Sequence, residues 1–158
     1  MIPVLMFDIY FCSPGDVPAM AEIEDISQVS PWPPSAIMAD LRKLENVTGY
    51  LGAFYRKELR GFIAVERWRK SLWIMELSVH PKWRRMGAGS QLLCGSYVLG
   101  EEWGCRLVEL TVRLSNREAL AFYKRHGFRV SRALERYYRN GEHGIRMVRR
   151  SLSAPHMG

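Results

Sequence analysis

The chain has 158 residues, of which 47% are hydrophobic and 25% charged, and its formal net charge is +7. Such a composition is typical of one globular domain, predicted here over residues 1–158, and it excludes a bilayer-spanning protein because no apolar run approaches the roughly 20 residues needed. The positive charge favours an anionic partner, namely nucleic acid, an acidic protein or a phosphorylated cofactor.

Apolar spacing and turn residues predict the elements of the N-terminal half. An apolar run predicts a strand over residues 4–11, and apolar residues at helical spacing predict a helix after Asp16. The prolines that follow cannot continue this helix, so a second helix is expected from Ser35. Three further strands are expected, at residues 47–55, 60–68 and 72–80.

The C-terminal half alternates between helices and strands. The expected elements are a helix from Ser90 to Gly104, a strand over 107–114, a helix over 117–126, and strands over 128–138 and 145–152. The whole order predicts an α+β fold built on a mixed sheet. The two strands joined by the helix after Ser90 are expected to run parallel.

A basic, glycine-bearing loop lies between the first of these two strands and the helix that follows it. Its residues are Arg84, Arg85, Met86, Gly87, Ala88, Gly89 and Ser90. The glycines let a bulky ligand approach the backbone, and the first N–H groups of the next helix lack partners within it. The helix dipole and the two arginines favour an anion, so a pyrophosphate is the predicted ligand. A plain basic turn is the alternative, because short glycine motifs are weak signals.

Two motifs together resemble the GNAT N-acetyltransferases, which depend on acetyl-CoA. They are Leu77–Gly89, LSVHPKWRRMGAG, and Asn116–Phe128, NREALAFYKRHGF. Within this superfamily the chain is most similar to the ribosomal-protein-alanine N-acetyltransferases, which modify a protein's N-terminal amine. The resemblance implies a GNAT fold, with a mostly antiparallel sheet, a central parallel strand pair and about four helices.

The resemblance places the acetyl-CoA site largely on backbone groups. It implies that Leu77, Ser78 and Val79 align the pantetheine arm and polarise the thioester carbonyl. It also implies that the amides from Arg85 to Ser90 hold the pyrophosphate. Asn116 is expected to cap its helix and to form a hydrogen bond with the cofactor, although capping alone is an alternative.

Tyr123 is the candidate general acid, seven residues after Asn116 as in the family. A phenol with a pKa of about 10 can protonate a departing thiolate whose thiol has a pKa near 8.5. The alternative is a tyrosine that only packs against Phe122 and Phe128.

The candidate base departs from the family pattern. Where the most similar family members carry a glutamate, this chain has Thr111, whose hydroxyl cannot replace a carboxylate. Glu109 on the same strand and Glu76 on the neighbouring strand could each act through a water molecule. The alternative is that both are structural or solvated carboxylates.

The acceptor site is expected from peripheral features. Trp32, in Ser30-Pro31-Trp32-Pro33, and the pair Tyr137-Tyr138 lie in regions that flank the acceptor groove in the family, and Thr111 is expected in the same groove. A helix-breaking turn that buries Trp32, and an ordinary aromatic strand pair, are the alternatives. An α-amine is about one-tenth neutral at pH 7 and a lysine less than about one-thousandth, so a weak base favours an N-terminal substrate.

The remaining features of the sequence bear on the cellular compartment, the partners and the alternative functions of the protein. The N-terminal residues lack a basic region, and Cys12, Cys94 and Cys105 lack zinc-site spacing, so we expect a cytoplasmic protein with no metal and no membrane partner. The expected partner is a protein or peptide N-terminus, in particular that of a ribosomal protein, attacked directly in a ternary complex. A GNAT enzyme for small amines and a non-catalytic CoA-retaining module that binds RNA or the ribosome are the alternatives; no RNA-binding motif is recognisable.

Overall fold

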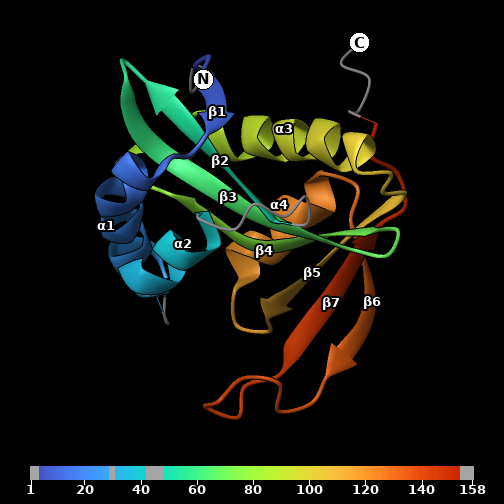
Figure 1. The fold of residues 1–158 in the computed structure, drawn as a ribbon. Coiled ribbons are helices and arrows are strands. Elements are labelled where there is room, and N and C mark those ends of the chain that lie inside the picture. The colour runs from blue at the N-terminus through green and yellow to red at the C-terminus, as the bar shows by residue number, and fades with distance from the viewer. Residues whose placement is uncertain (1–3, 29–30, 42–47, 154–158) are drawn as a thin grey trace.

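The computed structural model describes residues 4–28, 31–41 and 48–153, and within these ranges seven strands form one mixed sheet (Figure 1). The strands are β1 (Asp8–Phe11), β2 (Thr48–Tyr55), β3 (Glu58–Trp68), β4 (Ser71–Val79), β5 (Leu107–Arg113), β6 (Arg129–Leu134) and β7 (Gly144–Arg149). Their order across the sheet is β1-β2-β3-β4-β5-β7-β6. Neighbouring strands run antiparallel except β4 and β5, which are parallel.

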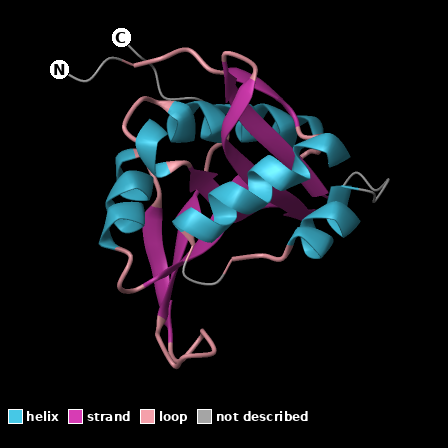
Figure 2. Ribbon diagram, turned by 90° about the vertical axis from the view of Figure 1, so that its left-hand side faces the viewer, coloured by secondary structure: helices cyan, strands magenta, loops and turns pink. Residues whose placement is uncertain are grey.

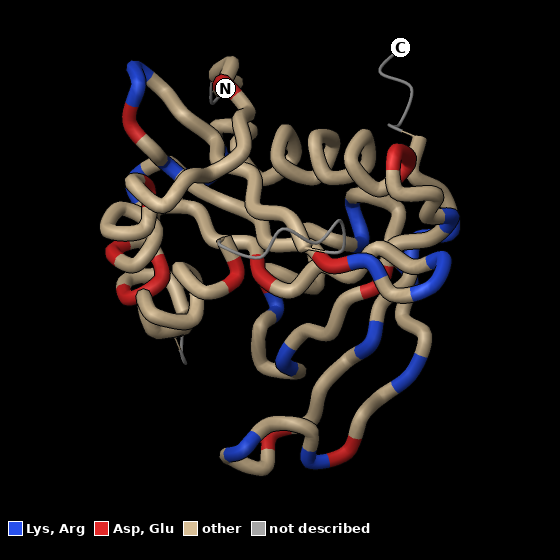
Figure 3. Tube along the Cα trace, viewed as in Figure 1, with Lys and Arg blue, Asp and Glu red and all other residues tan. Residues whose placement is uncertain are grey.

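Helices cover both faces of this sheet (Figure 2). They are α1 (Val17–Ser27), α2 (Pro34–Leu41), α3 (Ala88–Glu102) and α4 (Arg117–Arg125), with short 3-10 turns at Pro14–Asp16 and Pro81–Trp83. Figure 3 shows acidic residues along α1 and basic residues along β6, β7 and the segment between them. Among the described residues, no helix has the length and apolar character that crossing a bilayer requires.

Two hydrophobic cores lie on opposite faces of the sheet. The larger core joins α3 and α4 to the sheet through residues such as Ile63, Leu72, Leu92, Val108 and Tyr123. The smaller core joins α1 and α2 to the sheet through Met20, Ile23, Ile37, Tyr50, Phe62 and Ala64. Burial of these side chains, at about 1.5–3 kcal/mol for each large one, fixes the helices relative to the strands.

The parallel pair is short, and this opens the centre of the molecule. Ser71, Leu72 and Trp73 of β4 pair with Leu107, Val108 and Glu109 of β5, after which the two strands continue without pairing to each other. On its other edge, β4 follows β3 to Val79. A parallel pair that separates after three residues leaves a gap between β4 and β5, lined by unpaired backbone and alternate side chains.

A β-bulge in β4 lies at this gap. Val65 of β3 pairs with Ile74 and Ala64 pairs with Glu76, so Met75 is an extra residue. Such an insertion moves every later side chain to the opposite face. Ile74 packs in the larger core, whereas Glu76 lies on the face that α1 covers, beside Ala64 of the smaller core.

The predicted α+β class, the parallel pair and the number of helices are confirmed, and most element boundaries agree within two or three residues. The strand predicted over 4–11 is wrong at its start, since pairing begins only at Asp8 and the Leu5 N–H donates to the Met86 carbonyl (2.9 Å) instead. The strand predicted over 128–138 ends at Leu134, because the chain turns at Arg136, whose φ is 48°. Ser30, Val47 and the predicted domain limits at residues 1 and 158 lie outside the described residues.

Candidate active site

A pocket of about 910 Å³ lies among α3, α4 and the carboxyl end of β4. We call it the donor pocket. It is lined by ten of the predicted cofactor residues, namely Leu77, Ser78, Val79, Arg84, Arg85, Gly87, Ala88, Gly89, Ser90 and Asn116. Met86 was also predicted, but it packs against the larger core and its carbonyl is occupied by Leu5.

The first turn of α3 forms the floor of the donor pocket. Gly87 precedes the helix with a φ of 97°, and a Cβ there would come within 2.9 Å of the Val4 side chain. Only glycine adopts this conformation without strain, and it directs the first free N–H groups of α3 into the pocket. Gly89 is required for another reason, since a Cβ there would lie 3.1 Å from the Phe122 ring of α4.

Polar and basic groups complete this pocket. The Ser90 hydroxyl and His126 Nε2 are 3.0 Å apart. Burial, followed by the charges of Arg125 and Arg149, lowers the pKa of His126, so its imidazole is neutral at pH 7. A neutral imidazole can either accept a hydrogen bond from the Ser90 hydroxyl or donate one to it, depending on its tautomer. Arg84, Arg85, Arg117 and Arg125 also line the pocket. Helix N–H groups and guanidinium groups together suit a pyrophosphate.

A second pocket, of about 360 Å³, lies at the gap between β4 and β5. We call it the acceptor pocket. Its lining includes Trp32, Glu76, Thr111 and Tyr138 from the sequence-based prediction. The residues that line both pockets are Ser27, Gln28, Leu77, Asn116, Ala119 and Tyr123. The two pockets therefore meet inside the gap.

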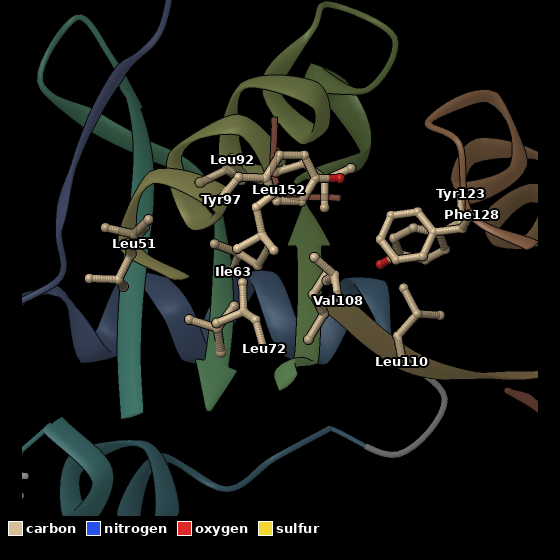
Figure 4. Close-up of a cluster of buried hydrophobic side chains, with 14 of the residues drawn as sticks. Leu51, Ile63, Leu72, Leu92, Tyr97, Val108, Leu110, Tyr123, Phe128 and Leu152 are labelled. Atoms are coloured by element: carbon tan, nitrogen blue, oxygen red, sulfur yellow. The ribbon is translucent and has the colours of Figure 1, made fainter. Parts of the chain in front are cut away.

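Tyr123 lies at this junction. It projects from α4 and is 6% exposed, with its ring edge-on to Phe128 at 5.3 Å (Figure 4). Burial first, and then the charge of Glu76, raises the pKa of its phenol. The hydroxyl consequently keeps its proton at any physiological pH, as a general acid must before it acts. Tyr123 therefore packs against Phe128 and also lines both pockets.

The two candidate bases have different positions. Glu76 lines the acceptor pocket, and burial together with Glu24 raises its pKa to about 9. Glu109 accepts a hydrogen bond from the Ser71 hydroxyl (2.6 Å) where β4 and β5 are still paired, and it is absent from the described lining of both pockets. Only Glu76 is therefore placed beside the pocket junction.

The aromatic residues of the acceptor side differ in role. Trp32 packs edge-on against Tyr50 at 6.4 Å, and its backbone N–H donates to Glu24 (2.9 Å). Tyr138 lies beneath the guanidinium of Arg113 at 3.9 Å. Tyr137 is 54% exposed and does not line the described pocket. Both tyrosines lie in the segment between β6 and β7, so the alternative of an aromatic strand pair is wrong.

Sequence reasoning missed Glu24, Gln28 and Arg113. Glu24 is the informative case, because it lies on the buried side of α1 one turn after Met20 and next to Ile23. A carboxylate inside an apolar helical stripe is a signal that the sequence carries. Asn116 was predicted correctly as a cap, since its side chain accepts from the Ala119 N–H (3.1 Å).

Comparisons with known proteins agree with this geometry. The profile of the Acetyltransferase (GNAT) family matches residues 17–128. A Methanocaldococcus jannaschii protein, named an uncharacterized N-acetyltransferase, is 30% identical over 90% of each chain. A Bacillus subtilis protein, provisionally named a ribosomal protein bS18-alanine N-acetyltransferase, is 29% identical over 84% of this chain and 87% of its own length. The crystal structure of Ard1 from Thermoplasma volcanium superimposes with a TM-score of 0.85 at 28% identity, covering 94% of this chain and all of that one.

Proposed function

This chain belongs to the acetyltransferase (GNAT) family, and we propose that it transfers an acetyl group from acetyl-CoA to the N-terminal amine of a protein. The observation that carries the proposal is the meeting of the two pockets at Tyr123 and Leu77, with Glu76 on the acceptor side. One pocket suits an anionic donor, and the other brings an amine to the same gap.

The residues of the donor pocket fit acetyl-CoA. The α3 N-terminus, Gly87 and the arginines would hold the pyrophosphate, and the unpaired edge of β4 at Leu77 offers backbone groups to the pantetheine arm. When bound, acetyl-CoA supplies the activated acetyl group. The other requirements of the reaction are met by this chain: backbone groups and side chains orient the cofactor, and side chains transfer the protons.

The chemistry assigns a task to each side chain at the junction. The amine nitrogen forms a bond to the thioester carbonyl carbon and the carbon–sulfur bond breaks. Glu76 takes a proton from the amine, directly or through one water molecule, and Tyr123 gives its proton to the departing thiolate. Glu76 then returns a proton to Tyr123, so the enzyme finishes in its starting state.

The acceptor assignment rests on charge and shape. An α-amine with a pKa near 8 needs less help from a base than a lysine near 10.4 does, and this site lacks the family's glutamate at Thr111. Trp32 and Tyr138 give the pocket aromatic walls, which suit a peptide segment. The Bacillus subtilis relative, provisionally named for an alanine of ribosomal protein bS18, supports a substrate of this kind.

A substrate panel tests the proposal. Peptides copied from the alanine N-terminus of a small-subunit ribosomal protein are offered beside the same peptides with a blocked N-terminus, and beside a set of small amines. Release of CoA is followed together with the product mass. We expect acetylation of the free N-termini. Turnover of the small amines with none on the peptides would show a metabolite enzyme instead.

A further inference from the structure

We propose that Glu24 and Glu76 form a carboxyl pair that shares one proton, and that Glu24 is a positioning residue which sets the pH at which Glu76 can act as the base. The inference rests on the proposed function for its catalytic meaning. The existence of the pair, however, can be measured without any turnover.

The environment of Glu24 keeps its carboxylate in one place. The side chain is 0% exposed, and it accepts hydrogen bonds from the Ser78 hydroxyl (2.8 Å) and from the Trp32 N–H (2.9 Å). Ser78 in turn accepts from the Gln28 amide (2.7 Å). Ser78 and Trp32 each donate to a different oxygen of Glu24, so both carboxyl oxygens act as acceptors.

Glu76 reaches this carboxylate because of the bulge in β4. Ser78 and Glu76 lie two residues apart on the strand and therefore face the same side, toward α1. Glu76 forms a side-chain hydrogen bond with Glu24. Two carboxyl groups can form such a bond only when one of them carries a proton. Burial and the Glu24 charge raise the pKa of Glu76, so the pair keeps this proton at neutral pH.

Among the described residues, the phenols whose pKa Glu76 affects carry no positive charge that would neutralise the pair. The phenols of Tyr50 on β2, Tyr123 on α4 and Tyr138 between β6 and β7 all have pKa values raised in part by Glu76. The Tyr50 hydroxyl already donates to Asp40 of α2 (2.8 Å).

Arg113 is the only Lys or Arg in the described lining of the acceptor pocket. It forms an ion pair with Glu142 (3.3 Å) and stacks on Tyr138. The charge of the carboxyl pair therefore remains available for an incoming ammonium group.

The pair has two consequences for catalysis. With one proton it carries a single negative charge, which attracts a cationic amine into the acceptor pocket. It becomes a competent base only when the shared proton leaves, so Glu24 moves activity toward alkaline pH. A purely structural Glu24 would hold α1 against β4 and leave the pH profile alone.

The variant Glu24→Gln separates these roles. A glutamine keeps an oxygen for Ser78 and gives Glu76 an N–H donor in place of a negative charge, so Glu76 should ionise about one to three pH units lower. The acid limb of kcat/KM should move to lower pH by that amount. The control Glu22→Gln makes the same charge change at an exposed position of the same helix and should leave the profile in place.

A second readout needs neither turnover nor the Glu24 variant. In wild-type protein labelled with ¹³C-glutamate, one side-chain carboxyl carbon should keep its protonated chemical shift at pH 7 and titrate near pH 9, and Glu76→Gln should remove that signal. The inference is overturned if every glutamate carboxyl ionises below pH 6, or if the Glu24→Gln profile coincides with that of the wild type. If no peptide is acetylated, the proposed function fails while the NMR titration still decides the pair.

Discussion

Tyr123 of α4 and Glu76 of β4 both line the acceptor pocket, and burial followed by the Glu76 charge raises the pKa of the Tyr123 phenol. Tyr123 also lines the donor pocket. A carboxyl that can take a proton and a phenol that can give one thus face the same gap between β4 and β5. This relationship connects the fold, through the early separation of the parallel strands, to the reaction.

Tyr123→Phe tests the acid. The substitution removes the hydroxyl and keeps the ring against Phe128, so stability should change little while kcat falls about 10²–10⁴-fold. Thermal unfolding and CoA release measure the two effects. Tyr137→Phe removes the same atom from an exposed side chain and should leave kcat near the wild-type value. Equal activity of all three proteins would remove Tyr123 from the mechanism.

Glu76→Gln and Glu109→Gln distinguish the two candidate bases. We expect the first to lower kcat about 10²-fold because the amine loses its proton acceptor. The second should cost about 1–2 kcal/mol of unfolding free energy, through a weaker bond with Ser71, and keep most of the activity. Steady-state kinetics and urea unfolding give both numbers. The reverse pattern would assign the base to Glu109.

Glu76 also makes stability depend on pH. Its folded pKa of about 9 lies above 4.5, the usual pKa of a glutamate, so the folded protein holds a proton that the unfolded chain has lost. The resulting stabilisation is complete below pH 4.5 and is lost as the pH rises to about 9. Between pH 5.5 and 8, the difference in unfolding free energy between wild type and Glu76→Gln should fall by about 1.4 kcal/mol per pH unit. A constant difference across urea titrations at pH 6, 7 and 8 would contradict the shared proton.

Gly87→Ala tests the role of the first turn of α3 in the donor pocket. Alanine is strained at a φ of 97°, and its Cβ would contact Val4, so the first turn of α3 should shift. We expect the KM for acetyl-CoA to rise about tenfold or more, because displaced N–H groups bind the pyrophosphate less well. Gly104→Ala is the matched control, with a φ of 79° and open space around its Cβ, and should lower stability without changing KM.

Most of the residues that line the donor pocket could be predicted from the sequence. The basic loop, Asn116 and Tyr123 lie in short local motifs whose spacing fixes their helices, and all of them except Met86 of the loop line the donor pocket. Local patterns carry such information because a cap or a helix N-terminus depends on residues close in the chain.

The acceptor side depends on features that no local pattern reveals. Alternation along β4 places Glu76 on the same face as Ile74, and only the bulge at Met75 turns it toward α1. Glu24 meets Ser78 across 54 positions of sequence, which explains why the carboxyl pair was not predicted. Glu109 was considered because it shares a strand with Thr111. It lies where β4 and β5 are still paired, and there it accepts a hydrogen bond from Ser71 and does not reach the gap.

The most direct test of the central claim is to locate the acetyl group on one peptide that carries both a free N-terminal alanine and a free lysine. After incubation with the enzyme and acetyl-CoA, tandem mass spectrometry distinguishes the two positions. We expect acetylation of the alanine α-amine by the wild-type enzyme and its loss in Tyr123→Phe. Acetylation of the lysine alone, or an unmodified peptide in the presence of a rapidly acetylated small amine, would contradict it.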